Sequence, residues 1–187
     1  MDYQELLAKR RSIRQFEDRP VEPEVLAAIL QDTTLAPTAS NGQPCKFVVV
    51  NDRDLIKQLS DESKANILAD VAADPSLRIA MYASALKNPD YNVFYNAPCL
   101  VIIVGPAAHE ILDIDCSLTA AYLMFAATER GLGTCWINLG ARIRKPELLE
   151  RLGIPADCRI VAPIIIGYPA STPQASPRHA PEVLKVI

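Results

Sequence analysis

The chain has 187 residues, of which 50% are hydrophobic and 22% are charged, and its formal net charge is −3. This length and hydrophobic content predict one folded domain with a single large core, and they exclude a disordered chain. The acidic balance argues against a general nucleic-acid-binding protein, which usually carries a basic face over the whole domain.

The chain shows no sign of membrane insertion or export. Its longest uncharged apolar run, 116–128, has 13 residues, whereas a bilayer requires about 20. The N-terminus lacks a basic stretch followed by an apolar one, so no secretory signal is expected. A cytoplasmic location, with no membrane partner, follows as an expectation.

The first predicted helix, 2–10, ends in a dense run of cations. Lys9, Arg10, Arg11, Arg14 and Arg19 place five of the 19 basic residues within eleven positions. Such a cluster in an acidic chain either binds an anion or compensates the negative end of the helix macrodipole, which stabilises a helix by about 0.3–1 kcal/mol per charge. The pattern alone leaves both interpretations open.

A second helix is predicted over 24–34, with Pro23 in its first turn. The following loop, 36–44, is rich in turn formers and small polar groups. It is typical of an ordinary connector, but it also offers hydroxyls, amides and backbone N–H groups that suit a polar heterocycle. The apolar run 45–50 then predicts a strand buried on both faces.

The middle of the chain predicts helix from Asp52 to about Ala85, broken at 74–76, and then a loop over 88–92. Tyr91, Phe94 and Tyr95 form an aromatic cluster, either a lid over a pocket or a satellite core. A second buried strand is predicted over 99–105.

A helix over 113–130 is apolar on all sides, which indicates a central position, or packing against its symmetry mate in a dimer. Gly131 is its candidate C-cap. Further elements are a strand over 134–137, a helix over 144–152, and a strand over 159–167 in which Pro163 implies an edge or a bulge. Strands separated by helices indicate a layered α/β or α+β domain.

The five cysteines are widely spaced, with neither a Cys-x-x-Cys pair nor a Cys/His spacing typical of a metal site. They are predicted to be buried free thiols, and no metal is expected. Two histidines are too few for a persuasive Ser-His-Asp or Cys-His nucleophile. Gly131-Leu132-Gly133 begins like a dinucleotide fingerprint, but Trp136 stands where its third glycine belongs.

Four separated motifs, in this order, resemble the FMN-dependent nitroreductase family: Arg10-Arg11-Ser12-Ile13-Arg14, Pro37 to Pro44, Gly131 to Ile137, and Gly167-Tyr168-Pro169 followed by Pro177-Arg178. The resemblance extends from Arg10 to about Arg178 and is weakest over 52–95. It implies a single FMN-binding domain over 1–187, an α+β sandwich with a mixed central sheet flanked by helices. It also implies an intertwined homodimer in which the C-terminal segment, about 169–187, reaches the partner subunit.

The resemblance further implies an FMN site at the matching positions, which are Arg10, Arg11, Ser12, Arg14, Pro37, Thr38, Ser40, Asn41, Gln43, Trp136, Ile137, Asn138 and Arg178. Arg10, Ser12 and Arg178 match the phosphate-binding positions, where guanidinium and hydroxyl donors suit a dianion. Arg14 matches a cation beside the N1/O2 edge of the flavin, which favours flavin reduction. Loop 38–43 matches a segment that reaches the flavin partly from the other subunit, and 136–138 match the segment that faces the ring.

The implied reaction is ping-pong. NADH or NADPH gives a hydride to the flavin, and a small electron-poor acceptor, such as a nitroaromatic or a quinone, then takes it. No catalytic side chain is demanded, because the flavin carries the electrons. The alternatives are a reductase of the same fold for an enone, a halogenated aromatic or free flavin, a non-catalytic FMN-binding redox sensor or store, and an anion-binding module without flavin.

Two departures from the family pattern bear on substrate preference. Cys45 stands where the family usually has Trp after Gln-Pro, and Asn138 stands where some members have an acidic residue. Both positions leave the expected FMN binding intact.

Overall fold

Residues 1–187 are all described by the computed structural model. Its α-helices are α1 (Tyr3–Lys9), α2 (Pro23–Thr33), α3 (Arg53–Ala73), α4 (Ala83–Lys87), α5 (Leu112–Glu129) and α6 (Pro146–Arg151). The strands are β1 (Lys46–Val50), β2 (Cys99–Pro106), β3 (Gly133–Trp136) and β4 (Cys158–Gly167). Short 3-10 turns are η1 (Ala39–Asn41), η2 (Arg78–Tyr82) and η3 (Asn138–Ala141). The predicted helices and strands are present with small shifts at their ends, except that the helical stretch predicted after 74–76 is the 3-10 turn η2 followed by the short helix α4.

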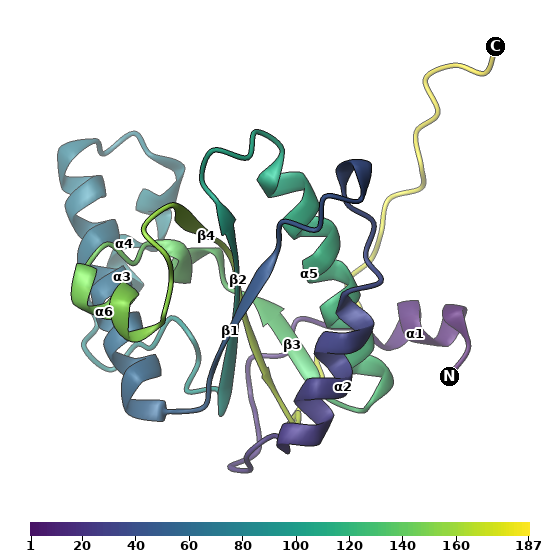
Figure 1. Ribbon diagram of the computed structural model, residues 1–187, viewed down its shortest axis with the longest axis horizontal. Helices are drawn as coiled ribbons and strands as arrows, with labels where there is room; N and C mark the ends of the chain where they lie inside the picture. The colour runs from purple at the N-terminus through teal and green to yellow at the C-terminus, as the bar shows by residue number, and fades with distance from the viewer.

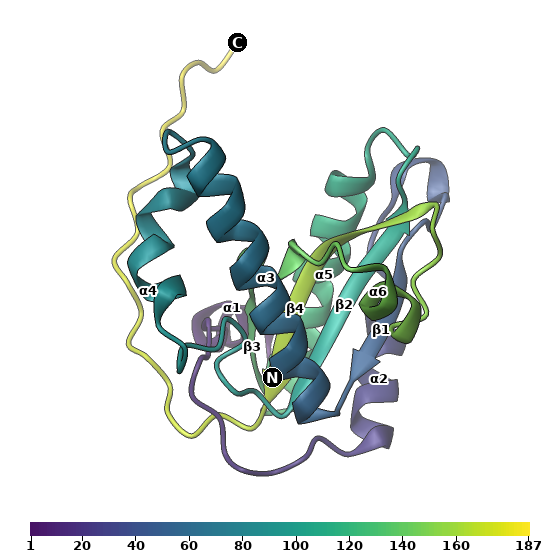
Figure 2. The same cartoon turned by 90° about the vertical axis from the view of Figure 1, so that its left-hand side faces the viewer.

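The four strands form one sheet in the order β1-β2-β4-β3, and all neighbours in it are antiparallel. The sheet therefore differs from the mixed one that the family resemblance implies. Its only parallel pairing is an isolated bridge between Ser12 and Thr134. Helices cover both faces, with α2 and α5 on one side and α3, α4 and α6 on the other (Figure 1). Figure 2 shows α3 and α6 in front of the sheet. The predicted α+β class is confirmed.

Two hydrophobic cores lie on opposite faces of this sheet, because side chains alternate along each strand. On β2, the side chains that face α2 and α5 are Cys99, Val101 and Ile103. Those that face α3 are Leu100, Ile102 and Val104. A strand buried on both faces reads as a continuous apolar run, as the sequence of β2 predicts.

The expected burial of β1 on both faces is wrong. This strand lies at the edge of the sheet, where only β2 pairs with it. Lys46 is exposed, and Val49 remains 39% exposed. The apolar run at 45–50 cannot distinguish an edge strand from a central one, because both are enriched in β-branched residues.

Pro163 does not lie on an edge strand, since β4 runs between β2 and β3. The register of β2 with β4 shifts between Ile103 and Val104, so the bulge lies at Val161, two residues before Pro163, which itself pairs with Ile102. Ile137 donates its backbone N–H to the carbonyl of Pro163, at 2.8 Å, just beyond the end of β3. Pro163 has no backbone N–H with which to donate a hydrogen bond in return, and the pairing of β3 with β4 ends at this point.

Within one chain, α5 is not the centrally buried helix that the sequence offered as one alternative, and packing against a symmetry mate stays a prediction. One face packs on the sheet through residues such as Cys116, Ala120 and Leu123. The other face carries Ile114 and Tyr122, which are 60% and 40% exposed. The helix thus presents an apolar outer stripe that this chain does not cover.

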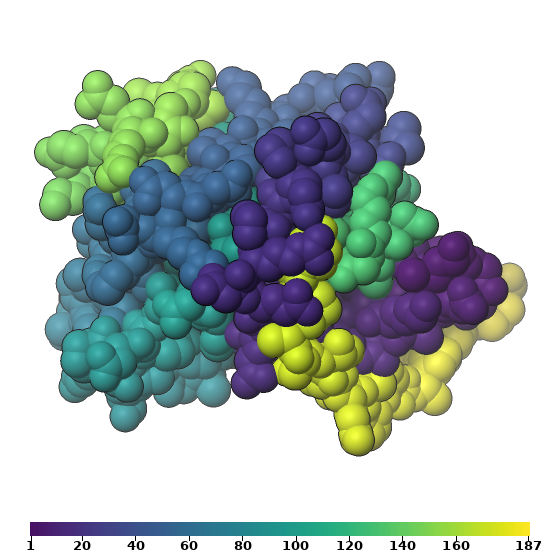
Figure 3. Space-filling view, turned by 90° about the horizontal axis from the view of Figure 1, so that it is seen from below, coloured from purple at the N-terminus to yellow at the C-terminus, as the bar shows by residue number.

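The C-terminal tail has no helix or strand beyond residue 170 and extends away from the body (Figure 1). Its apolar end is largely exposed, at Val183, Leu184, Val186 and Ile187. Figure 3 shows the beginning of the tail, in yellow, against the N-terminal segment, in purple. No helix has both the length and the hydrophobicity needed to span a bilayer.

All five cysteines are free thiols, as predicted. Three are buried, but Cys45 and Cys158 are only half-buried, so the expectation of full burial is wrong for those two.

Candidate functional site

The segment after α1 runs between β3 and the start of the tail. Ile13 donates its backbone N–H to the carbonyl of Thr134 at 2.9 Å, and Glu17 donates to the carbonyl of Tyr168 at 2.9 Å. Ala170 donates back to the carbonyl of Gln15 at 3.0 Å. These bonds fix residues 12–17 in an extended conformation beside the sheet.

Ile13 anchors this segment, because its side chain is only 3% exposed. Alternation along an extended chain then directs Ser12 and Arg14 to the opposite side, where Ser12 is half-buried and Arg14 is exposed. The local sequence therefore presents a hydroxyl and a guanidinium outward from a single apolar anchor.

The tail closes a first cavity, of about 440 Å³, over this segment. We call it the basic cavity, and its polar lining comes from two distant parts of the chain. Its residues are Leu7, Ala8, Arg10, Arg11, Ser12, Arg14, Pro173, Gln174, Ala175, Ser176 and Arg178. The structure thus brings together the five predicted residues of the N-terminal segment and the tail.

A second cavity, of about 580 Å³, lies between η2, the loop after α4, and the end of β3. We call it the aromatic cavity. Its residues are Arg14, Asp70, Leu77, Arg78, Ile79, Met81, Tyr82, Tyr91, Val93, Tyr95, Trp136, Ile137, Asn138, Leu139 and Arg142. The predicted residues Trp136, Ile137 and Asn138 all line it. Arg14 lines both cavities and so marks where they meet.

The arginines divide into two groups by their partners. Half of the chain's arginines form ion pairs with carboxylates; these are Arg19, Arg53, Arg130, Arg144, Arg151 and Arg159. The other half have no carboxylate within 4 Å, and each lines at least one of the two cavities; these are Arg10, Arg11, Arg14, Arg78, Arg142 and Arg178. Guanidinium groups without carboxylate partners that converge on cavities are typical of an anion-binding site.

The aromatic cluster is divided between a main hydrophobic core and the aromatic cavity, and its role as a lid stays a prediction. Phe94 is 1% exposed and belongs to the core on the α3 face. Tyr91 and Tyr95 line the aromatic cavity with their rings edge to face, 6.1 Å apart. The Arg14 guanidinium carbon lies 5.7 Å from the centre of the Tyr95 ring, within the range of a cation–π contact. Burial raises the pKa of the Tyr91 hydroxyl, so this ring stays neutral.

Lys64, which sequence reasoning missed, holds the loop that carries Tyr91. Its side chain is buried, and its ammonium group donates to the carbonyls of Asn88 and Tyr91, each at 2.8 Å. A buried ammonium is stable only when its donors find partners. A lysine within an amphipathic helix gives no sequence signal for this role.

The predicted loop residues Pro37, Thr38, Ser40, Asn41 and Gln43 line neither cavity. Three of them, Ser40, Asn41 and Gln43, have positive φ values of 50°, 54° and 46°. Residues other than glycine rarely adopt this conformation, and such outliers often cluster at functional sites. Within one chain, this loop is therefore separate from the rest of the predicted site.

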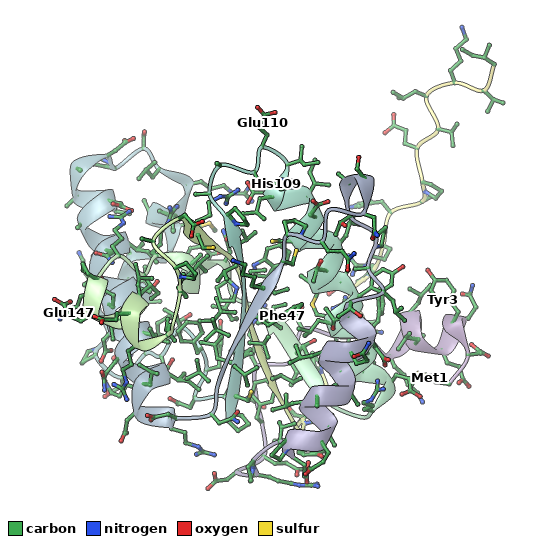
Figure 4. The ribbon with its side chains drawn as sticks, in the orientation of Figure 1. Met1, Tyr3, Phe47, His109, Glu110 and Glu147 are labelled. Carbon is green, nitrogen blue, oxygen red and sulfur yellow. The ribbon has the colours of Figure 1, made fainter.

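A buried carboxylate missed by sequence reasoning fixes this loop. Asp115, at the start of α5, accepts the backbone N–H of Ala39 at 3.0 Å and contacts His109 Nε2 at 3.0 Å. The Ala39 N–H, aided by His109, holds the pKa of Asp115 below its usual value. Figure 4 shows His109 beside Glu110 in the connection that leads into α5.

The same part of the molecule contains a close pair of thiols. The Sγ atoms of Cys45 and Cys116 lie 3.4 Å apart, and the Thr119 hydroxyl donates to Cys45 at 3.3 Å. The hydrogen bond from Cys116 is the main cause that lowers the pKa of Cys45 to about 7. Cys45, noted above only as a departure from the family pattern, is thus a thiol with substantial thiolate character near neutral pH.

Comparisons with known proteins bear on the family and the fold of this chain. The family model described as the nitroreductase family matches residues 7–168. A protein of Archaeoglobus fulgidus named NADH dehydrogenase/NAD(P)H nitroreductase is 30% identical over 172 residues, 88% of this chain and 83% of the relative. An FMN reductase [NAD(P)H] of Bacillus subtilis is 28% identical over 180 residues, 95% of this chain and 70% of the relative.

Solved structures show the same fold. A nitroreductase of Bacteroides fragilis, determined with bound FMN, superposes with a TM-score of 0.83 at 23% identity. The match covers 100% of this chain and 99% of that one.

Proposed function

Because this chain belongs to the nitroreductase family of oxidoreductases, we propose that it binds FMN and passes a hydride from NADH or NADPH to a small electron-poor acceptor. The single observation that carries the proposal is the convergence of unpaired arginines on two cavities that share Arg14. The first cavity suits a phosphate, and the second suits an aromatic ring. A phosphorylated flavin has both parts.

The donors of the basic cavity fit a phosphate dianion. Neither Arg10 nor Arg178 forms an ion pair with a carboxylate of the protein. Ser12 lies between Arg10 and Arg14 in the sequence, at the start of the extended segment. Charge-assisted hydrogen bonds from guanidinium groups are about twice as strong as neutral ones. We assign the phosphate to Arg10, Ser12 and Arg178, with Arg11 completing the positive lining.

Arg14 and the residues that end β3 would contact the flavin ring. Trp136, Ile137 and Asn138 provide an apolar surface and polar groups on one side of the aromatic cavity. A fixed positive charge on Arg14 stabilises negative charge that develops on the ring during reduction. Bound FMN supplies the hydride chemistry, so the side chains only bind and orient the reactants and exclude water.

A homodimer would complete the site. The strained loop at 38–43 lies outside both cavities, while the outer stripe of α5 and the end of the tail expose apolar side chains. Association of two copies would cover the α5 stripe and bring Thr38, Ser40, Asn41 and Gln43 of one copy to the flavin of the other. Residues 169–187 would then run past the basic cavity and place the apolar end of the tail on the partner.

The test is one absorbance experiment on the purified protein. We expect a yellow protein whose flavin absorbance is bleached by NADH or NADPH without oxygen and returns when a nitroaromatic or a quinone is added. Yellow protein that neither donor bleaches would instead be a redox sensor or store. Colourless protein that does not bind added FMN would be an anion-binding module, and the proposal would be wrong.

The acceptor is then identified by steady-state assays over a panel. Nitro reduction no faster than the background rate would favour an enone, a halogenated aromatic or free flavin as the acceptor of the same fold.

A further inference from the structure

Two arginines of the aromatic cavity lie outside the proposed contacts with FMN. Arg14 is assigned to the flavin, whereas Arg78 and Arg142 line the cavity away from the FMN phosphate site. We propose that Arg78 and Arg142 select a reactant that carries a carboxylate or a phosphate group beside its reacting ring. This inference rests on the proposed function and specifies the class of substrate that the same site takes.

Neither guanidinium is engaged by the protein. No carboxylate lies within ion-pair distance of Arg78 or Arg142, and no hydrogen bond is made by either guanidinium. Both side chains are exposed, so a ligand that enters the cavity can accept hydrogen bonds from the N–H groups of two guanidinium groups. Arginine forks of this kind match the geometry of carboxylate and phosphate oxygens.

The acidic side chain in the cavity lining does not cancel these charges. Asp70 is bound on both of its oxygens by Arg144, at 2.8 and 2.6 Å. This interaction with Arg144 is the main reason that the pKa of Asp70 falls below its usual value. Arg144 thus neutralises Asp70, and the field inside the cavity is that of Arg14, Arg78 and Arg142.

Arg142 is held in place through its backbone. Asn66 on α3 donates its side-chain amide to the carbonyl of Arg142 at 2.8 Å. Glu62, one turn earlier, accepts the same amide at 2.8 Å and the backbone N–H of Lys145 at 3.1 Å. A helix of 21 residues therefore fixes the segment that carries Arg142, which is the rigidity that a binding site requires.

Arg78 lies on η2 among exposed apolar side chains. Met81 is 71% exposed, Tyr82 is 45% exposed and Leu77 is 38% exposed, and all three line the cavity. An aromatic ring would cover this surface while an anionic substituent meets the guanidinium groups. A neutral ring would use only the first of these interactions.

The anion has two chemical sources in a two-step reaction, because the acceptor and the nicotinamide donor occupy the site in turn. A carboxylate would come from the acceptor, and a phosphate from the donor. The variants are Arg78→Gln and Arg142→Gln, with Arg78→Lys and Arg142→Lys to restore charge. Arg53→Gln is the matched control, because Arg53 pairs with Asp18 outside both cavities.

The first arm measures the oxidation of dithionite-reduced holoenzyme by 4-nitrobenzoate and by 4-nitrobenzamide in stopped flow. These acceptors share a ring and differ in charge, and their intrinsic difference in reactivity cancels when variant and wild type are compared. We expect each Gln variant to lower the rate ratio, anionic over neutral, by about three- to tenfold, and each Lys variant to restore part of it.

The second arm measures reduction of the oxidised holoenzyme by NADH and NADPH, compared with 1-benzyl-1,4-dihydronicotinamide, which has no phosphate. If the Gln variants lower only the rate ratio of NADH or NADPH over the phosphate-free donor, the anion is a phosphate of the donor. If they lower only the rate ratio of 4-nitrobenzoate over 4-nitrobenzamide, the anion is a carboxylate of the acceptor. Both outcomes support an anion site at these arginines. Ratios that match Arg53→Gln in both arms overturn the proposal.

A third measurement separates this proposal from the proposed function. Trp136, the only tryptophan, lines the cavity and reports binding by fluorescence without turnover. If the wild-type holoprotein reacts with no donor or acceptor, the proposed function fails. The anion site then stands if 4-nitrobenzoate quenches Trp136 at lower concentration than 4-nitrobenzamide and both Gln variants abolish that preference. It fails if the two ligands bind alike.

Discussion

The side chain of Ile13 lies directly over Gly133, the first residue of β3. A Cβ built on Gly133 would lie 2.5 Å from Cγ1 of Ile13 and 2.7 Å from its Cβ, closer than such atoms approach in proteins. The absence of a side chain at Gly133 therefore allows the extended segment 12–17 to lie against the sheet. Ser12 and Arg14, on either side of Ile13, reach their positions through this contact.

Replacing Gly133 by alanine should displace this segment. Overpacking of a core contact typically costs about 1–3 kcal/mol, and here the displaced residues carry the cavity donors. We expect Gly133→Ala to lower stability by about that amount in urea unfolding and to weaken FMN binding by at least about fivefold. Gly153→Ala is the control, because Gly153 has positive φ and open space around it, so that variant should lose stability alone. Unchanged FMN affinity in Gly133→Ala would show that the segment's position does not depend on this contact.

Arg10→Ala should weaken FMN binding by about 1.5–3 kcal/mol, the usual value of a hydrogen bond to a charged group. The measurement is a fluorescence titration of apoprotein with FMN, at more than one salt concentration. Arg151→Ala serves as the control, since Arg151 pairs with Asp52 away from both cavities. Equal FMN affinity in wild type and Arg10→Ala would remove Arg10 from the site.

Arg14→Ala should leave FMN bound but lower the midpoint potential of the bound flavin. Removing a positive charge beside the ring destabilises the reduced, more negative form relative to the oxidised form. Spectroelectrochemical titration of the variant holoprotein gives the shift, and Arg14→Lys should recover part of it. A midpoint potential equal to that of the wild type would contradict the electrostatic role of Arg14.

The secondary structure could be predicted well from periodicity and turn residues, whereas relations between elements could not. Pro23 and Pro146 both begin helices, and Gly131 ends α5 with a φ of 78°. These are local effects of proline and glycine on the backbone, so the local sequence is enough to predict them. The edge position of β1 and the exposed stripe of α5 depend on neighbours in space, about which a short apolar run contains no information.

The candidate site shows the same limit. The cations at Arg10 and Arg14 are conspicuous as a cluster, but only the tail contacts bring Arg178 to the same cavity. Arg78 and Arg142 are 64 positions apart, and nothing in the local sequence relates them. Lys64 and Asp115 were missed for a similar reason, since their partners are backbone groups of distant loops.

The thiol of Cys45 should react with iodoacetamide with a midpoint near pH 7, because hydrogen bonds from Cys116 and Thr119 lower its pKa to about 7. Only the thiolate reacts, so the rate falls as the pH drops through this value, whereas an ordinary cysteine would show a midpoint of about 8.5. Peptide mass spectrometry after timed alkylation gives the rate at Cys45. Cys116→Val removes the main donor and should raise the midpoint, and Cys116→Ser should keep it low. An unchanged midpoint in Cys116→Val would rule out this cause.

Deletion of residues 180–187 should weaken dimerisation without affecting the fold of the monomer. The segment holds four apolar side chains that are between 68% and 106% exposed, so its removal takes no contact from the core of its own chain. Burying such side chains on a partner would contribute about 1.5–3 kcal/mol each. Arg178 is retained, so the phosphate donors remain on the shortened chain.

The measurement for this deletion is sedimentation velocity over a dilution series, with circular dichroism to follow the fold. We expect the truncated protein to dissociate at least about tenfold more readily than the full chain. Replacing Val183, Leu184, Val186 and Ile187 by serine keeps the tail's length and should have the same effect if apolar burial is the cause. Equal dissociation constants for the full chain and both variants would show that the tail does not contribute to association, and the outer stripe of α5 would then have to account for any dimer by itself.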